Sequence, residues 1–144
     1  LYGVLRQFEL MYVLGDERDL IGQCTDVYLN GVYVYRSQLT RDECRALLVD
    51  VLRRANELAA QPEFYNTFTN NCTTNIVRHL NRLPGRKLPY NYQVIMPGHF
   101  DELLHQRGLI AGDVSLAQAR LRARVNRLAY LYADSPDYSA KIRQ

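Results

Sequence analysis

Hydrophobic and polar positions in this chain follow different periods in different segments. Residues 8–14 are apolar except for Glu9, a pattern typical of a largely buried strand. A charged stretch at residues 15–19 follows, and we expect a solvated turn there rather than a cation site. Other short apolar runs are bounded by turn residues such as Asn30-Gly31. The pattern predicts short strands at residues 8–14, 20–24, 27–36 and 94–96.

Valine and tyrosine alternate in the third of these segments. A period of two places Val32 and Val34 on one face, and Tyr33 and Tyr35 on the other. We expect the tyrosines to cover a sheet face rather than to form a ligand-binding box.

Elsewhere, apolar residues recur every three or four positions, as they do on one face of a helix. Thr40 and Glu43 have the spacing of a capping box, and Pro62 ends the periodic segment that follows. Ser115 opens a second capping box. The pattern predicts helices at residues 40–60, 72–83, 100–107 and 115–132.

Length and composition indicate a single globular domain spanning residues 1–144. The chain is 47% hydrophobic and 23% charged, which is ordinary for such a domain. It opens on Leu1 directly in sequence typical of folded structure, so we expect a fragment that lacks its N-terminal portion. The net charge of +3 is mild, and zinc-ligand spacings, a phosphate loop and long basic runs are missing. We therefore expect no nucleic-acid partner, metal or cofactor.

Three cysteines leave at least one without a partner in the chain. We predict that Cys44 packs in the core, on the apolar face of its helix. Cys24 is expected either in the core or in a disulfide. Cys72 follows two asparagines, which are typical cap residues, at the start of a predicted helix. Unsatisfied N–H groups at a helix N-terminus favour a thiolate, so Cys72 is either a nucleophile or a small buried residue in a capped first turn.

A catalytic cysteine usually requires a histidine as general base. His79 lies seven residues after Cys72, about 10 Å along the same helix. We therefore expect it at the surface or half-buried rather than beside the thiol. The loop of His99 could fold back onto the helix, and His105 is a weaker candidate. The sequence offers no convincing base for Cys72.

Several segments, in order and spacing, resemble the Lnb N-terminal periplasmic domain family, named after a bacterial lipoprotein N-acyltransferase. The resemblance covers most of residues 4–112, and the block around Cys72 is its most specific part. The segments are Glu9-Leu10-Met11-Tyr12-Val13, Asp16-Glu17-Arg18-Asp19-Leu20-Ile21, Val32-Tyr33-Val34-Tyr35, Pro62-Glu63-Phe64-Tyr65-Asn66-Thr67, Asn70-Asn71-Cys72-Thr73-Thr74-Asn75 and Met96-Pro97-Gly98.

This family is similar to circularly permuted papain-like thiol enzymes of the NlpC type. The resemblance implies an α+β, papain-like fold, in which a small antiparallel sheet packs against the cysteine-bearing helix with other helices around it. It implies a general base on a strand upstream of Leu1. It also implies a place in the bacterial cell envelope, at its periplasmic or extracytoplasmic face.

The resemblance further implies acyl chemistry on an acyl-lipid or lipoprotein substrate. Cys72 would attack an ester or amide carbonyl, and its own backbone N–H would help to hold the oxyanion. The acyl group would then pass to an amine or to water, as in an acyltransferase or a hydrolase. Tyr65, Asn70, Asn71 and Thr73 are the residues expected to bind substrate.

The alternative is a membrane-associated envelope module without catalysis, built on the same frame. Arg120, Arg124 and Arg127 recur at helical spacing in the last predicted helix. This row is either a solvated face or a contact with a partner or an anionic membrane surface.

Overall fold

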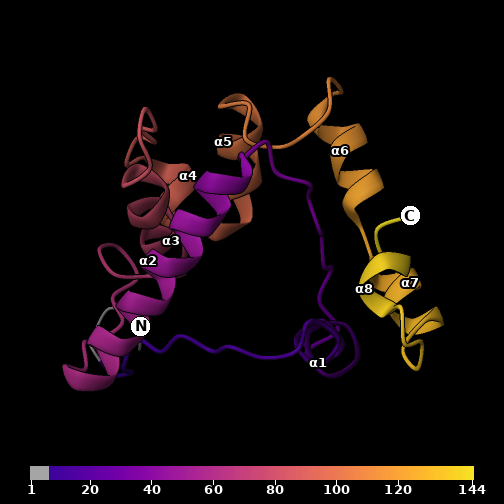
Figure 1. Ribbon diagram of the computed structural model, residues 1–144, viewed down its shortest axis with the longest axis horizontal. Coiled ribbons are helices and arrows are strands. Elements are labelled where there is room, and N and C mark those ends of the chain that lie inside the picture. The colour runs from indigo at the N-terminus through magenta and orange to yellow at the C-terminus, as the bar shows by residue number, and fades with distance from the viewer. Residues whose placement is uncertain (1–6) are drawn as a thin grey trace. The chain divides into compact units, whose positions relative to one another are not determined.

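The computed structural model describes residues 7–144 (Figure 1) and divides them into two compact units. The first unit combines residues 7–12 with Gln38–Leu109, and the second combines Val13–Ser37 with Ile110–Gln144. Helices of the first unit are α2 (Arg41–Ala60), α3 (Cys72–Asn81), α4 (Tyr92–Ile95), the 3₁₀ turn η2 (Pro97–His99) and α5 (Phe100–Gln106). Those of the second are α1 (Glu17–Gly22), the π-helical turn η1 (Gln23–Val27), α6 (Leu116–Ala123), α7 (Asn126–Leu131) and α8 (Tyr138–Lys141).

The predicted α+β, papain-like fold with a small antiparallel sheet is wrong. Among residues 7–144 the structure contains helices and four isolated antiparallel bridges, but no strand and no sheet. The bridges join Glu9 to Phe64, Tyr33 to Arg124, Ser37 to Ile110, and Asn66 to Asn70.

The extended segment at residues 8–10 shows why pairing stops after one bridge. Leu10 N–H donates to the Glu63 carbonyl at 2.7 Å, and Tyr65 N–H donates to the Phe8 carbonyl at 2.7 Å. The partner is only residues 63–65, because the Gln61 N–H before it still donates to Glu57 at the end of α2. On its other side the chain turns back through the bridge at Asn66. The two segments therefore have no further residues that could extend the ladder of backbone hydrogen bonds.

Two of the predicted strands are helical. Asp16 caps α1 by accepting a hydrogen bond from Arg18 N–H at 2.9 Å, so the predicted charged turn at residues 15–19 forms the beginning of a helix. Residues 20–24 continue that helix into η1, where Cys24 is half-buried and forms no disulfide. Asn91 likewise caps α4, which takes up most of residues 94–96. In both places a local N-cap favours a helix over the predicted strand.

The predicted helix at residues 40–60 is confirmed, with a complete capping box between Thr40 and Glu43. The expected burial of Cys44 is wrong, because its side chain is exposed. The apolar stripe of α2 is wider than the surface that covers it. Leu47 packs against the core and Leu58 is buried, whereas Leu48 is 57% exposed.

The core of the first unit surrounds α3, which runs beside α2 (Figure 1). Val77 and Leu80 on α3 pack with residues from α4, from α5 and from the segments before α4 and after α5, namely Leu83, Leu88, Val94, Leu103 and Leu109. Gly108 ends the predicted helix at residues 100–107 with a φ of 64°, a conformation that glycine adopts readily. This packing fixes α3, and with it the position of its first residue, Cys72.

The second unit has its own core, formed by α1, α7 and α8. Val32 and Val34 pack against this core, whereas Tyr33 and Tyr35 stack on each other with ring centroids 6.3 Å apart. The predicted separation of valines and tyrosines is therefore confirmed, but the expectation that the tyrosines cover a sheet face is wrong, because no sheet forms among residues 7–144. The core residues are Ile21, Val125, Ala129, Tyr138 and Ile142.

The predicted helix at residues 115–132 is broken in two. Ser115 caps α6 as expected, but Arg124 is extended, with φ −72° and ψ 113°. Val34 N–H donates to the Ala123 carbonyl at 2.8 Å, and Val125 N–H donates to the Val32 carbonyl at 3.0 Å. These two bonds to the 32–34 segment interrupt the helix. The predicted arginine row therefore does not lie on one helical face, and its contact with an anionic membrane stays a prediction. Within residues 7–144, no helix combines the length and apolar character that a membrane span requires.

Candidate functional site

Cys72 is the first residue of α3, and its thiol is exposed. Asn71 caps the helix: its Oδ1 accepts from Thr74 N–H at 2.7 Å, and its own N–H donates to Thr74 Oγ1 at 2.8 Å. The Cys72 Sγ lies 3.6 Å from Thr73 Oγ1. The positive end of the helix dipole therefore lies at the thiol, where it stabilises negative charge.

Asn70 ties the loop before Cys72 to the body of α3. Its Oδ1 accepts from Asn75 Nδ2 and from Arg78 Nη1, each at 3.0 Å. Its Nδ2 donates to the Phe64 carbonyl at 3.1 Å and to Glu63 Oε2 at 3.2 Å. This network holds the approach to Cys72 in one conformation.

A pocket of about 470 Å³ opens beside the thiol, within the first unit. Its volume is in the range of small-molecule sites, about 300–1,000 Å³. Most of its wall is apolar or aromatic. The lining residues are Glu9, Leu10, Met11, Tyr12, Val51, Tyr65, Cys72, Asn75, Ile76 and His79.

The structure places only some of the predicted site residues on this pocket. Cys72 and Tyr65 line it. Burial raises the pKa of Tyr65, and the negative charge that Cys72 can carry raises it further. Asn71 and Thr73 are buried, at 1% and 2% exposure, and neither they nor Asn70 line the pocket. Their predicted part in binding substrate stays a prediction.

His79 is the site residue that sequence reasoning missed. It was expected at the surface or half-buried, but it is only 4% exposed. Its Nδ1 lies 2.6 Å from Asp50 Oδ2, and its Nε2 lies 2.7 Å from the Tyr12 hydroxyl. In the tautomer whose Nδ1–H donates to the carboxylate, Nε2 is free to accept the Tyr12 proton. His79 therefore connects a carboxylate on α2 to a phenol on the pocket wall.

The pKa values of Asp50 and Tyr12, at the two ends of this array, are shifted in opposite directions. Burial alone would raise the pKa of Asp50, but hydrogen bonds from His79 and Arg82 outweigh it and hold that pKa below its usual value. Burial raises the pKa of Tyr12, and the positive charges of Arg54 and Arg78 offset this only in part. The His79 ring therefore joins a carboxyl group with a lowered pKa to a phenol with a raised pKa.

The other two histidines lie away from the pocket. His99 Nδ1 is 3.0 Å from Glu102 Oε1, and its ring packs edge-on against Tyr92. His105 is on α5. Neither lines the pocket beside Cys72, so the loop of His99 does not fold back onto the thiol.

A family model described as the Lnb N-terminal periplasmic domain matches residues 1–98. This match confirms the resemblance carried by the motifs, and it spans both Cys72 and His79. It also confirms the expected location, on the periplasmic side of the bacterial envelope. No curated protein and no solved structure matches the chain.

Proposed function

Because the chain belongs to the Lnb N-terminal periplasmic domain family, we propose that it performs thiol-dependent acyl chemistry in the bacterial envelope, through Cys72. The observation that carries this proposal is the exposed thiol at the capped N-terminus of α3, on the wall of an apolar pocket. The site thus combines three features: a thiol nucleophile, a helix N-terminus that stabilises negative charge, and an apolar pocket that can hold an acyl chain.

In the first step the Cys72 thiolate attacks the carbonyl carbon of an ester or amide. A carbon–sulfur bond forms, and the carbonyl electrons move onto the oxygen, which accepts hydrogen bonds from N–H groups at the start of α3. Collapse of this oxyanion expels the alcohol or amine, which takes up a proton, and leaves a thioester on Cys72. An amine or water then attacks the thioester, and the thiol is released.

The second step needs a group that removes a proton from the incoming amine or water. The Tyr12 hydroxyl lines the pocket and bonds to His79. It can accept that proton while its own proton moves to His79 Nε2, and the Asp50 carboxylate stabilises the resulting imidazolium. This array would act in addition to the upstream base that the family resemblance implies.

The surroundings of the pocket support an acyl-lipid or lipoprotein substrate. Met11 and Ile76 line it and are 75% and 45% exposed. Phe64 and Phe68, in the loop tied to α3, are 53% and 51% exposed. Apolar side chains around an apolar pocket are typical of a site that takes a hydrocarbon chain from a lipid phase.

An activated ester tests the nucleophile. The protein is incubated with p-nitrophenyl octanoate, and acylated peptides are identified by mass spectrometry. We expect one octanoyl group on Cys72, no such adduct in Cys72→Ser, and an unchanged adduct in Cys44→Ser, which removes the other exposed thiol. Acylation of Cys44 in preference to Cys72 would refute the proposal.

The same pocket could hold an acyl chain without any chemistry, in an envelope binding module. The exposed apolar residues around it would serve both functions equally. Saturable octanoate binding, combined with failure of Cys72 to acquire an octanoyl group from the ester, would favour this second function.

A further inference from the structure

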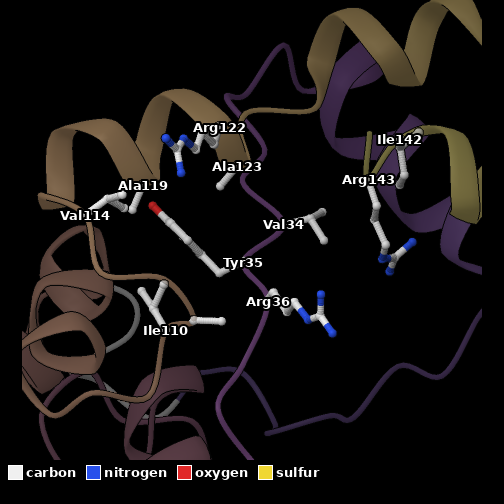
Figure 2. Close-up of a pocket in the computed structure, with 11 residues that line it drawn as sticks. Val34, Tyr35, Arg36, Ile110, Val114, Ala119, Arg122, Ala123, Ile142 and Arg143 are labelled. Atoms are coloured by element: carbon white, nitrogen blue, oxygen red, sulfur yellow. The ribbon is translucent and has the colours of Figure 1, made fainter.

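The second unit contains a pocket of its own, of about 510 Å³. The extended segment at residues 34–36 forms one wall, and the start of the 110–114 loop, α6 and the end of the chain form the others (Figure 2). All its lining residues belong to the second unit, so it is distinct from the pocket beside Cys72. Most of them lie beyond residues 1–98, the part that the family model matches.

Backbone hydrogen bonds hold the extended wall at both ends. Val34 N–H donates to the Ala123 carbonyl at 2.8 Å, and Ala111 N–H donates to the Arg36 carbonyl at 2.7 Å. Tyr35 lies between these two points, and its ring extends toward α6, with the hydroxyl near Ala119 (Figure 2). The wall is therefore fixed, and the pocket is preformed.

The pocket has apolar surfaces and positive charge. Ile110, Ala119 and Ala123 line it and are buried, and the alanines leave room that larger side chains would fill. Arg36, Arg122 and Arg143 also line it, whereas its lining contains no aspartate or glutamate.

The three guanidinium groups differ in their partners. Arg143 forms an ion pair with Glu17, with Nη1 2.9 Å from Oε2. Arg36 and Arg122 are exposed, and neither has a carboxylate partner among residues 7–144. Two positive charges at the pocket are thus left for a ligand to neutralise.

We propose that this pocket binds an anionic amphiphile, a single hydrocarbon chain that ends in a phosphate or carboxylate group. The chain would lie on Ile110, Ala119 and Ala123, where it loses contact with water. The anionic group would accept hydrogen bonds from Arg36 or Arg122, because guanidinium groups match the geometry of phosphate and carboxylate oxygens. This site goes beyond the proposed acyl chemistry and does not depend on Cys72.

Four ligands separate the contributions of chain and charge. Decyl phosphate, decanoate, decyl maltoside and inorganic phosphate are titrated into the full chain by calorimetry, the amphiphiles below their micelle concentrations. We expect at least one of the two acids to bind at least tenfold more tightly than decyl maltoside and inorganic phosphate. The acid that binds with the higher affinity identifies the preferred anionic group as phosphate or carboxylate.

Matched variants assign the binding to this pocket. The double variant Arg36→Gln/Arg122→Gln should weaken binding of the preferred acid at least tenfold, and Arg127→Gln, an exposed charge of the same unit outside the pocket, should change it less than twofold. Surface changes of this kind seldom affect folding, which circular dichroism can check. Undiminished affinity in the double variant, equal binding of decyl maltoside, or no binding by either acid would overturn the proposal.

Discussion

The Nε2 atom of His79 lies 2.7 Å from the hydroxyl of Tyr12, a residue 67 positions earlier in the chain. The two rings pack edge-on with centroids 5.8 Å apart. Because Asp50 holds the opposite nitrogen at 2.6 Å, the orientation of the imidazole is fixed. A phenol backed by histidine and carboxylate thus lines the pocket that contains Cys72.

Tyr12→Phe should separate the two chemical steps. The p-nitrophenolate leaving group needs no proton, so we expect the initial acylation of Cys72 to be largely retained. Release of the acyl group to water or an amine should slow by about 100- to 10,000-fold, the usual range for loss of general base catalysis. Stopped-flow burst and steady-state rates measure the two steps.

Tyr92→Phe is the matched control, because Tyr92 is an exposed tyrosine of the same unit that does not line the pocket. We expect its rates to equal those of the wild type. Equal steady-state rates for Tyr12→Phe and the wild type would exclude a role for Tyr12 in proton transfer.

Asp50 should contribute to stability in a pH-dependent way. Its pKa is lowered in the folded state, so its contribution is fully present above the ordinary aspartate value of about 3.9. That contribution is lost as pH falls through the lowered value. Urea unfolding between pH 7 and pH 2.5 should therefore show a steeper acid loss in the wild type than in Asp50→Asn.

At pH 7, Asp50→Asn should also lower the free energy of unfolding by about 1–3 kcal/mol, because a charged hydrogen-bond partner of buried His79 is removed. Asp113→Asn removes an exposed charge and should change it by less than about 0.5 kcal/mol. Parallel acid profiles for Asp50→Asn and the wild type would contradict the lowered pKa of Asp50 in the folded protein.

Cys72 and Cys44 should differ in reactivity although both are exposed. Cys72 lies at the first position of α3, and Cys44 lies in the N-terminal half of α2, beyond its first turn. The helix N-terminus stabilises a thiolate within the first turn only, so limiting iodoacetamide should label Cys72 first. Peptide mapping would show which cysteine is labelled first. Faster labelling of Cys44 would contradict the proposal that Cys72 is the nucleophile.

The cap of α3 should matter for stability. Asn71→Ala removes a side chain that accepts from Thr74 N–H and donates to the Thr67 carbonyl at 2.7 Å. Loss of an N-cap costs about 1–2 kcal/mol, which thermal unfolding would measure. Cys72→Ser should change stability less, because the thiol is exposed and little volume is lost. The reverse order would indicate that Cys72 is a structural residue.

The starts of four helices, α2, α3, α5 and α6, followed from the sequence alone. Thr40, Asn71 and Ser115 each cap a helix through residues three positions later, and such local contacts are the same in any tertiary setting. The position of Cys72 at a helix start was predictable for this reason. The family followed from motif order and spacing, which need no structure.

The features that depend on partners distant in the sequence were decided only by the tertiary structure. The segments at residues 8–14 and 27–36 had the apolar pattern of strands, but a strand needs a neighbour of similar length, and each found only isolated bridges. The bonds from residues 32–34 divided the last predicted helix at Arg124. His79 is buried and connects Asp50 to Tyr12 because α2 and the N-terminal segment both pack against α3 at this residue. Contacts across such separations depend on how the chain closes its loops, which local pattern does not specify.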